Sequence, residues 1–485
     1  MSLGERTEGT SPPAGATPGH AVADPPPAHD GPDDPSVPLW PFLVCAVVGV
    51  GLRFWGLGDG ALGVDETFST VSSRKPYLSI WGYIQSVDRH PPLSYLVLSP
   101  VVHLTHSTYA ARVPSVACAT LALLIFVWWQ RRSGLAGLVA CALFAVSPFL
   151  LPYAREARMF GLVTLGAVIV AAASDRWLDT GETKWAVAVA IGGLIASLSY
   201  GPGIVLACAA GLVPGWRRDR QAWIFRVVAG VGVVVWAALC LAASLRWSGY
   251  PSGYPPFTVS WVVTMLSYTV APVPANRWIV VGLLAIGLVL VLRRPGPLRQ
   301  LTLALFLAPL AAMVVLSLRT EVLIPKTLLL LGWVTPVLLG QTVAWAWRYR
   351  PLAAGVVLAV IVYVTVPYIG ASLPVGEGTG AMLSALDHVR RPGDAVAINP
   401  RPLESVFQWY EGVVPGKPLV VDNRAVDGLG ILHVVGQAPT NRVWLIESEA
   451  RAWKVKLPHD WRPCGARRHV GGGYSMQCVE VGAAP

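Results

Sequence analysis

Long apolar segments recur along most of this 485-residue chain and constrain its fold more than any other feature. A membrane-spanning helix needs about 17–25 predominantly apolar residues. Because 54% of the residues are hydrophobic and only 13% are charged, the composition is that of a polytopic membrane protein and not of a soluble multidomain one. Eleven runs reach or approach the spanning length, at 39–57, 110–129, 135–152, 159–174, 185–199, 203–216, 224–246, 276–292, 301–318, 325–346 and 352–369.

Arginines in the short loops predict how these segments are oriented. The net charge of +10 lies mainly on arginines between apolar runs, which is how topology is encoded, so it does not indicate nucleic acid binding. One further apolar run, 93–105, covers less than about 20 Å as a helix and is too short to span. If it does not span and the N-terminus is cytoplasmic, four basic loops become cytoplasmic: those at Arg131-Arg132, Arg217-Arg218, Arg293-Arg294 and Arg348.

We therefore predict an all-α polytopic protein of about eleven spans in the cytoplasmic (plasma) membrane, with 93–105 re-entrant or lying along the interface. This topology places the loop 58–92 and everything after about residue 370 outside the cytoplasm. The membrane domain then covers 39–370. Residues 1–38 are rich in Pro, Gly, Ala and Asp and show no apolar periodicity, so they are expected to form a disordered tail.

The C-terminal segment 371–485 changes character and predicts a small extracytoplasmic α/β domain. Short β-type runs at 395–398, 419–421 and 442–446 alternate with polar and Gly/Pro turns, and 380–390 has a helical pattern. Cys464 and Cys478 flank Gly471-Gly472-Gly473, which is typical of a hairpin turn. In an oxidising compartment the two cysteines would form a disulfide. A slip of the hairpin register would instead separate them.

The loop 58–92 holds a density of charge that most of the chain lacks. A charge at the bilayer centre costs about 2.5–3.5 kcal/mol or more, so this loop should lie at a membrane face or in a wet cavity. We interpret it as the floor of an active site. Asp65 is the candidate general base for an acceptor hydroxyl, and Glu66 would orient it or bind a metal. Considered alone, the dipeptide is far more typical of a solvated loop.

Two further clusters carry candidate substrate-binding groups. Asp88 and His90 precede Pro91-Pro92, and the double proline holds His90 extended, where it could meet a phosphate. Alternatively, this is only a rigid turn before a helix. Arg155 and Arg158 are spaced i and i+3 around Glu156, so on a helix they would share a face and clamp a phosphate. Snorkelling of arginine to the interface is the plain alternative.

In order and spacing these motifs resemble a known family, the multispanning GT-C glycosyltransferases, and within it the protein O-mannosyltransferase (family 39-like, bacterial) and lipid A aminoarabinose transferase branch. Ile324-Pro325-Lys326, followed by Thr335-Pro336, is similar to a late element of that branch, with Lys326 where Arg is usual. The other motifs that carry the resemblance are Asp65-Glu66, His90-Pro91-Pro92-Leu93, Ala111-Arg112-Val113-Pro114-Ser115 and the octapeptide from Tyr153 to Phe160.

The resemblance implies an enzyme that takes a sugar, mannose-like or other, from a polyprenyl-phosphate donor. It would pass the sugar to a glycan, lipid or protein acceptor outside the membrane. Asp65 would be the base, His90 and Arg112 would lie near the donor phosphate, and Glu156 would be the acidic position after the third span. Lys326 would carry the phosphate contact of the late element. Because the leaving group is already a phosphate anion, no strong general acid is required.

The same residues also allow a metal site and two other functions to be considered, those of a transporter and of a receptor. A divalent metal is compatible with ligands from Glu66, Asp88 and His90, but no spacing requires one. A transporter or flippase of a lipid-linked glycan would be expected to show internal repeats and broken helices at mid-membrane. No repeat is evident, and the ionisable residues gather at one face. A receptor that only presents the C-terminal domain leaves Asp65 and Arg158 without a role.

Overall fold

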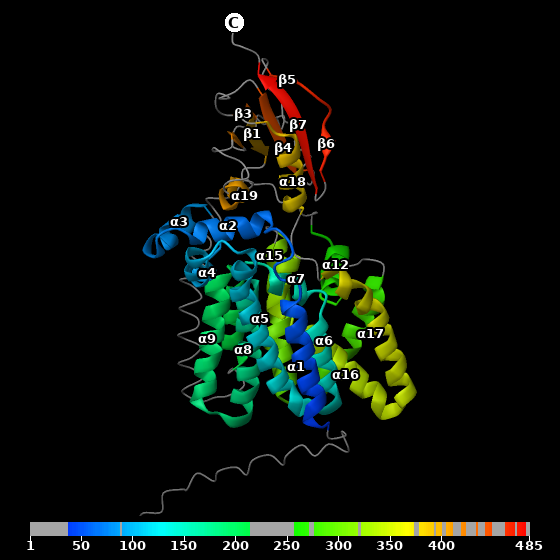
Figure 1. Cartoon of the computed structure of the whole chain (residues 1–485). Coiled ribbons are helices and arrows are strands. Elements are labelled where there is room, and N and C mark those ends of the chain that lie inside the picture. The colour runs from blue at the N-terminus through cyan, green and yellow to red at the C-terminus, as the bar shows by residue number, and fades with distance from the viewer. Residues whose placement is uncertain are drawn as a thin grey trace, which may run out of the picture.

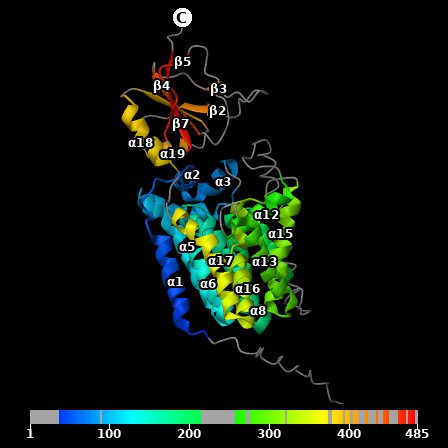
Figure 2. The same cartoon turned by 90° about the vertical axis from the view of Figure 1, so that its right-hand side faces the viewer.

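The computed structural model describes most of the chain, and its helices form a bundle that carries a smaller α/β region on one end (Figures 1 and 2). Asp88, the apolar run 224–246 and all but the last two residues of the predicted N-terminal tail lie outside the described part. The described residues are 37–87, 90–213, 257–270, 276–318, 322–372, 378–391, 394–399, 404–410, 419–422, 433–434, 442–448, 461–470 and 473–481.

Each apolar run that the structure describes contains a helix, because a helix satisfies all of its backbone hydrogen bonds internally. Large apolar side chains such as Trp40, Val47 and Leu352 are exposed on the outside of the bundle, as on a surface in contact with lipid. The helices of the bundle are α1 (Leu39–Phe54), α5 (Thr108–Gln130), α6 (Gly134–Val146), α7 (Leu150–Arg155), α8 (Phe160–Thr180), α9 (Thr183–Ser199), α10 (Gly203–Leu212), α12 (Val259–Tyr268), α13 (Arg277–Arg293), α14 (Pro297–Thr302), α15 (Ala308–Ser317), η6 (Pro325–Leu331), α16 (Val334–Tyr349) and α17 (Pro351–Ser372).

Four stretches of the described chain are long and apolar enough to cross a membrane: Thr108–Val146, Phe160–Thr180, Pro297–Ser317 and Pro351–Gly370. Pro325–Leu331 and Val334–Tyr349, which are bent by 58° relative to each other, would together make a fifth. Several other apolar helices are shorter than a usual span. These features are those of a membrane protein, but the predicted total of eleven spans is not confirmed.

Close helix crossings hold the bundle together. α9 and α10, which correspond to the runs 185–199 and 203–216, form a tight hairpin around Gly201-Pro202. α8 is well enclosed and lies directly against α9. At this crossing a Cβ added to Gly166 would lie 2.7 Å from the carbonyl oxygen of Gly192. Glycine at both positions therefore permits an approach that larger residues would prevent.

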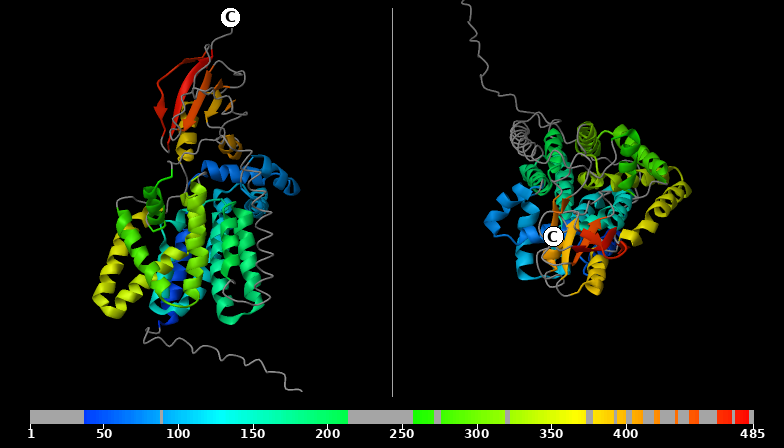
Figure 3. Two further views of the ribbon diagram at one scale, coloured as in Figure 1. Left: turned by 180° about the vertical axis from the view of Figure 1, so that it is seen from behind. Right: turned by 90° about the horizontal axis from the view of Figure 1, so that it is seen from above.

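Short helices of the first loop cover the end of the bundle that faces the α/β region (Figures 1 and 3). They are α2 (Val64–Ser73), η1 (Tyr77–Ser79), α3 (Ile80–Val87) and α4 (Leu93–Leu104). The short apolar run 93–105 is thus a twelve-residue helix, α4. α2 packs against both α4 and the C-terminal helix α19 (Glu404–Trp409), so it lies between the bundle and the α/β region.

The C-terminal region contains a mixed sheet in the order β3-β2-β1-β4-β7-β5, with β6 paired to β7. β1 runs parallel to both β2 and β4, whereas β4 and β7 are antiparallel. The predicted runs become β1, β2 and β4, and the helical pattern becomes α18 (Thr379–Val389). The strands are β1 (Ala395–Asn399), β2 (Leu419–Asp422), β3 (His433–Val434), β4 (Arg442–Ser448), β5 (Trp461–Pro463), β6 (Arg468–His469) and β7 (Tyr474–Val481).

The hairpin predicted around the triple glycine is formed by β6 and β7. Gly473 has a φ of +77°, a conformation that favours glycine. The register of the hairpin places Arg468 opposite Met476. Cys464 and Cys478 are joined by a disulfide with a Cα–Cα distance of 5.3 Å, which confirms the predicted pairing.

Candidate active site

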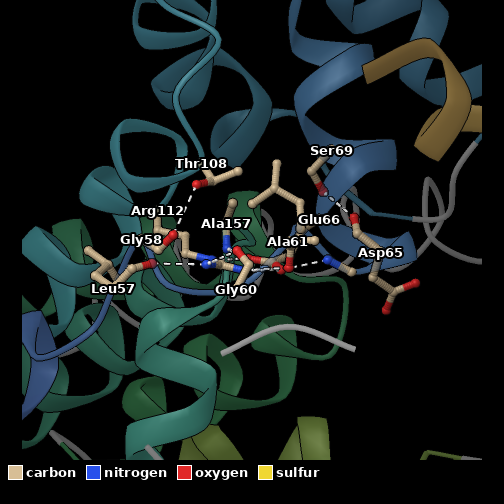
Figure 4. A network of polar contacts seen from close by, with 12 residues as sticks. Leu57, Gly58, Gly60, Ala61, Asp65, Glu66, Ser69, Thr108, Arg112 and Ala157 are labelled. Carbon is tan, nitrogen blue, oxygen red and sulfur yellow. Dashed lines mark hydrogen bonds and ion pairs between the residues drawn. The ribbon is translucent and has the colours of Figure 1, made fainter. Parts of the chain in front are cut away.

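Asp65 and Glu66 lie in the first turn of α2, where the amides at a helix N-terminus favour negative charge. Successive residues on a helix point about 100° apart. The two carboxylates therefore face different surroundings, and Figure 4 shows Asp65 turned away from the network around Glu66. The sequence-based expectation that Glu66 orients Asp65 or binds a metal stays a prediction.

Glu66 forms a buried, two-pronged ion pair with Arg112 of α5. Its Oε1 accepts from Arg112 Nε and from the Ala157 amide, and its Oε2 accepts from Arg112 Nη2 and from the Gly63 amide, all at 2.8–2.9 Å. A carboxylate offers about four acceptor sites, so these contacts use all of them. The pair ties α2 to α5 and to the turn before α8 (Figure 4).

Arg112, which the resemblance places near the donor phosphate, bonds to groups of the protein itself. Its guanidinium is fully buried and also donates to the carbonyls of Leu57, Gly60 and Ala61. Together with Glu66, these acceptors engage all five N–H groups of the side chain. In this arrangement Arg112 has no donor left for a phosphate, and it instead fixes the loop before α2. Likewise, Glu66 has no lone pair left for a metal.

Asp65 is the centre of a second, more open cluster. Its Oδ2 lies 2.8 Å from Lys326 Nζ, at the start of η6, and 3.8 Å from Arg158 Nη2. Arg158 Nη1 also donates to the main-chain carbonyl of Asp65 at 3.0 Å. About half of the Asp65 side chain is exposed (49%), whereas that of Arg158 is buried (6%). The carboxylate is thus held by two cations and is accessible to a ligand.

The two acidic groups of this cluster have opposite electrostatic surroundings. The Arg158 guanidinium first, and then the Lys326 ammonium and His90, hold the pKa of Asp65 well below its usual range, despite the opposing effect of burial. Burial raises the pKa of Glu156 to about 8, and the neighbouring Glu66 and Asp65 carboxylates add to this rise. Asp65 is therefore ionised near neutral pH, while Glu156 retains its proton.

Arg155 and Arg158 do not share a helix face, contrary to the expectation from their spacing. α7 ends at Arg155 and α8 begins at Phe160, so Arg158 lies in the break between the two helices. Arg155 is fully buried, and its Nη2 donates to the carbonyl of Trp55. Arg158 turns instead toward Asp65 and Ser69. Of these two arginines, Arg158 is the one that contacts Asp65.

His90 lies near the same cluster, immediately before α4. Its ring centroid is 5.3 Å from the ring of Tyr200, at the turn between α9 and α10. Its charge also affects Asp65, which places it on the same side of the bundle. Asp88 cannot be placed, because it lies outside the described residues. Within the described part of the chain, no group of three metal-ligating side chains occurs that could hold a metal ion.

A small pocket with both polar and apolar lining residues adjoins the cluster at Arg158. Arg158 lines it together with the hydroxyl-bearing residues Ser69, Ser94 and Ser115, and Leu98 and Ala157 complete part of its wall. The pocket lies between α2, α4 and α5 and gives Arg158 polar neighbours away from lipid. Ser69 and Ser94 did not stand out in the sequence, because isolated serines have no diagnostic spacing. Ser115 appeared only as the last residue of the Ala111–Ser115 motif.

Contacts from the C-terminal region to α2 were also absent from the sequence-based prediction. The hydroxyl of Tyr410 accepts from the Leu62 amide at 2.7 Å, and the hydroxyl of Thr379 donates to the Leu62 carbonyl at 2.8 Å. The adjacent aromatic residues Trp409 and Tyr410 were the only local signal for this contact. Leu62 stands three residues before Asp65, so these bonds act close to the site.

Comparison with known proteins supports the fold of the chain. No protein-family model matches the sequence, and no curated protein matches it. The structure is similar to that of ArnT from Cupriavidus metallidurans bound to undecaprenyl phosphate, with a TM-score of 0.54 and 13% identity. It is also similar to the same protein in the apo state, with a TM-score of 0.55 and 15% identity. Both matches cover 90% of this chain and 97% of the other. These matches show that the chain shares the fold of ArnT.

Proposed function

We propose that this protein is an integral-membrane glycosyltransferase that moves a sugar from a polyprenyl-phosphate donor to an extracytoplasmic acceptor, with Asp65 as the general base. The observation that carries the proposal is the half-exposed Asp65 carboxylate between Lys326 and Arg158, at the loop-covered end of the bundle. The shared fold adds support, since ArnT has been crystallised with undecaprenyl phosphate.

The cations suit the donor. A lipid donor lying in the bilayer leaves its phosphate near the membrane surface, where Lys326 and Arg158 can form charge-assisted hydrogen bonds with it. His90 is near enough to contribute when it is protonated. Of the phosphate-binding residues predicted from the sequence, we retain Lys326, Arg158 and His90, and we assign Arg112 and Arg155 to the scaffold. Glu156, protonated near neutral pH, is a candidate hydrogen-bond donor to the sugar.

The reaction follows from these positions. Asp65 takes the proton of the acceptor hydroxyl while its oxygen attacks the anomeric carbon of the sugar. The bond from that carbon to the phosphate oxygen breaks, and polyprenyl phosphate leaves as an anion next to the two cations. General base catalysis of this kind typically contributes about 10²–10⁴-fold to the rate.

Donor binding would also prepare the base. A phosphate placed against Lys326 and Arg158 competes with Asp65 for both cations. As their attraction for the carboxylate weakens, the pKa of Asp65 rises toward its ordinary value and the carboxylate becomes a better proton acceptor. The same two cations would thereby couple donor binding to the basicity of Asp65.

The proposal includes an orientation. The cluster, the loop 58–92 and the C-terminal domain (371–485) are extracytoplasmic, and residues 39–370 form the catalytic membrane domain of a plasma-membrane protein. This follows from the arginine loops described above, which become cytoplasmic in that orientation. The loop helices and the C-terminal sheet lie at the same end of the bundle, as this orientation requires (Figure 1).

The experiment is a transfer assay with purified protein in lipid vesicles and a panel of polyprenyl-phosphate sugars, which measures release of polyprenyl phosphate and glycosylated product. Asp65→Asn keeps the size of the side chain but loses its basicity, so we expect transfer to fall by at least about 10²-fold with donor affinity retained. Asp59→Asn, which removes an exposed carboxylate from the same loop, is the matched control and should leave transfer unchanged.

Two results would contradict the proposal. Near-native transfer by Asp65→Asn would show that Asp65 is not the general base, which would then have to be Glu156 or Asp88. Movement of intact donor across the vesicle membrane, without release of polyprenyl phosphate from any donor tested, would instead indicate a flippase for lipid-linked glycans.

A further inference from the structure

The segment that leads into α2 is held from both sides. On the bundle side, Arg112 bonds to three carbonyls of residues 57–61 and to Glu66. On the other side, Tyr410 and Thr379 of the C-terminal region bond to the amide and the carbonyl of Leu62. Both main-chain polar groups of Leu62 therefore depend on side chains that are more than 300 positions away in the sequence.

Side-chain packing extends this interface along α2. Leu62 is fully buried in a cluster that includes Trp409. The Thr67 and Ser405 hydroxyls lie 3.1 Å apart, so a hydrogen bond also joins the middle of α2 to α19. At the far end of α2, the Arg74 guanidinium stacks over the Trp409 ring at 4.3 Å. The interface thus extends along the whole of α2, from Leu62 just before the helix to Arg74 just after it.

These contacts distinguish the C-terminal region from an independent module on a tether. Thr379, Ser405 and Trp409 of that region are all buried. Removal of the Tyr410 or the Thr379 hydroxyl would take away the hydrogen bond that it makes with a main-chain group of the buried Leu62, which is costly inside a protein. A helix that carries a half-exposed Asp65 has few bulky side chains of its own to fix its position.

We propose that Tyr410 and Thr379 are positioning residues that hold α2, and with it the Asp65 carboxylate, in register with Lys326 and Arg158. This inference rests on the proposed function for its catalytic consequence. The C-terminal region is then part of the active-site scaffold, and its hydrogen bonds to Leu62 set the position of the base without touching substrate.

The test combines hydrogen exchange of full-length protein in vesicles with kinetics. Thr379→Val and Tyr410→Phe each delete one hydroxyl and keep the shape of the side chain. Loss of one net hydrogen bond should speed exchange of the amides in 62–73 by about threefold to tenfold. Thr379→Ser keeps the hydroxyl and should restore native exchange. Thr365→Val deletes a buried hydroxyl of α17 that bonds only within its own helix, and should not change exchange in α2.

Measurements of kcat and KM distinguish a positioning role of these hydroxyls from a general effect on stability. We expect kcat to fall about threefold to tenfold in Thr379→Val and Tyr410→Phe, with the donor KM unchanged and with Thr379→Ser close to native. Native exchange in α2 in both hydroxyl-deletion variants would overturn the inference, as would faster exchange with an unchanged kcat. If exchange responds as expected but the native protein transfers no sugar, the proposed function fails while the structural coupling stands.

Discussion

At the residue scale, two adjacent carboxylates of α2 differ in almost every physical respect. Glu66 is buried with all of its acceptor sites used, whereas Asp65 is half-exposed and contacts two cations. The sequence alone predicted that one would orient or assist the other. It could not show which partner each would meet, because Arg112 is 46 positions from Glu66 and Lys326 is 261 positions from Asp65. Only the resemblance to a known family pointed to Lys326.

Glu66→Gln tests the structural role of the buried pair. The substitution leaves the fully buried Arg112 without its countercharge, which typically costs about 3–5 kcal/mol. We therefore expect a large loss in the free energy of unfolding, and no effect of a chelator on native transfer. Glu182→Gln, which breaks an ion pair whose side chains are exposed, should cost no more than about 1 kcal/mol. A stable Glu66→Gln variant that loses activity, together with inhibition of the native protein by a chelator, would show that Glu66 is a metal ligand.

Glu156 gives a prediction about pH. Its pKa is raised to about 8 in the folded protein, mainly by burial. Between the ordinary pKa of a glutamate, about 4.3, and that value, the folded protein keeps a proton that the unfolded chain has released. Stability should therefore fall as the pH rises through this window. Glu156→Gln removes the titrating group, so its unfolding free energy should depend less on pH between 5 and 8. Identical pH dependence in the two proteins would refute the shift.

At the scale of elements, apolar periodicity predicted the helices of the bundle well, because in a bilayer only internally hydrogen-bonded segments are stable. The runs 135–152 and 159–174 predicted a break between two helices, and the structure has one between α7 and α8. The i, i+3 spacing of Arg155 and Arg158 would place them on one face only in a continuous helix, which this break prevents. Contacts such as Tyr410 to Leu62 could not be predicted, because they join residues more than 300 positions apart in the sequence.

Replacing two helix glycines by alanine should change stability in opposite directions. Gly166 lies at the crossing of α8 and α9, whereas Gly282 lies in α13. Alanine is favoured over glycine in a helix by about 0.5–1 kcal/mol, so Gly282→Ala, which would meet no atom within 4 Å, should be neutral or stabilising. Gly166→Ala would place its Cβ 2.7 Å from the Gly192 carbonyl oxygen and should destabilise by about 1–3 kcal/mol. Thermal unfolding in lipid vesicles measures both. Equal melting temperatures would show that α8 and α9 can separate freely at this point.

At the scale of the whole molecule, the orientation in the membrane can be measured directly. A reporter fused after Arg350 should be cytoplasmic, and one fused after Gly376 should be external, because α17 lies between them and is long enough to cross the bilayer. Both reporters on the same side, or the reverse order, would contradict the orientation on which the extracytoplasmic site depends.

The most direct test of the central claim is a density map of the full-length protein with undecaprenyl phosphate bound. The proposed function predicts a phosphate within hydrogen-bond distance, about 2.7–3.2 Å, of Lys326 or Arg158, on the side of the bundle that Asp65 faces. The prenyl chain should leave along the outside of the apolar helices. A phosphate bound at the opposite end of the bundle, or held by neither cation, would contradict the assignment of this cluster as the site of transfer.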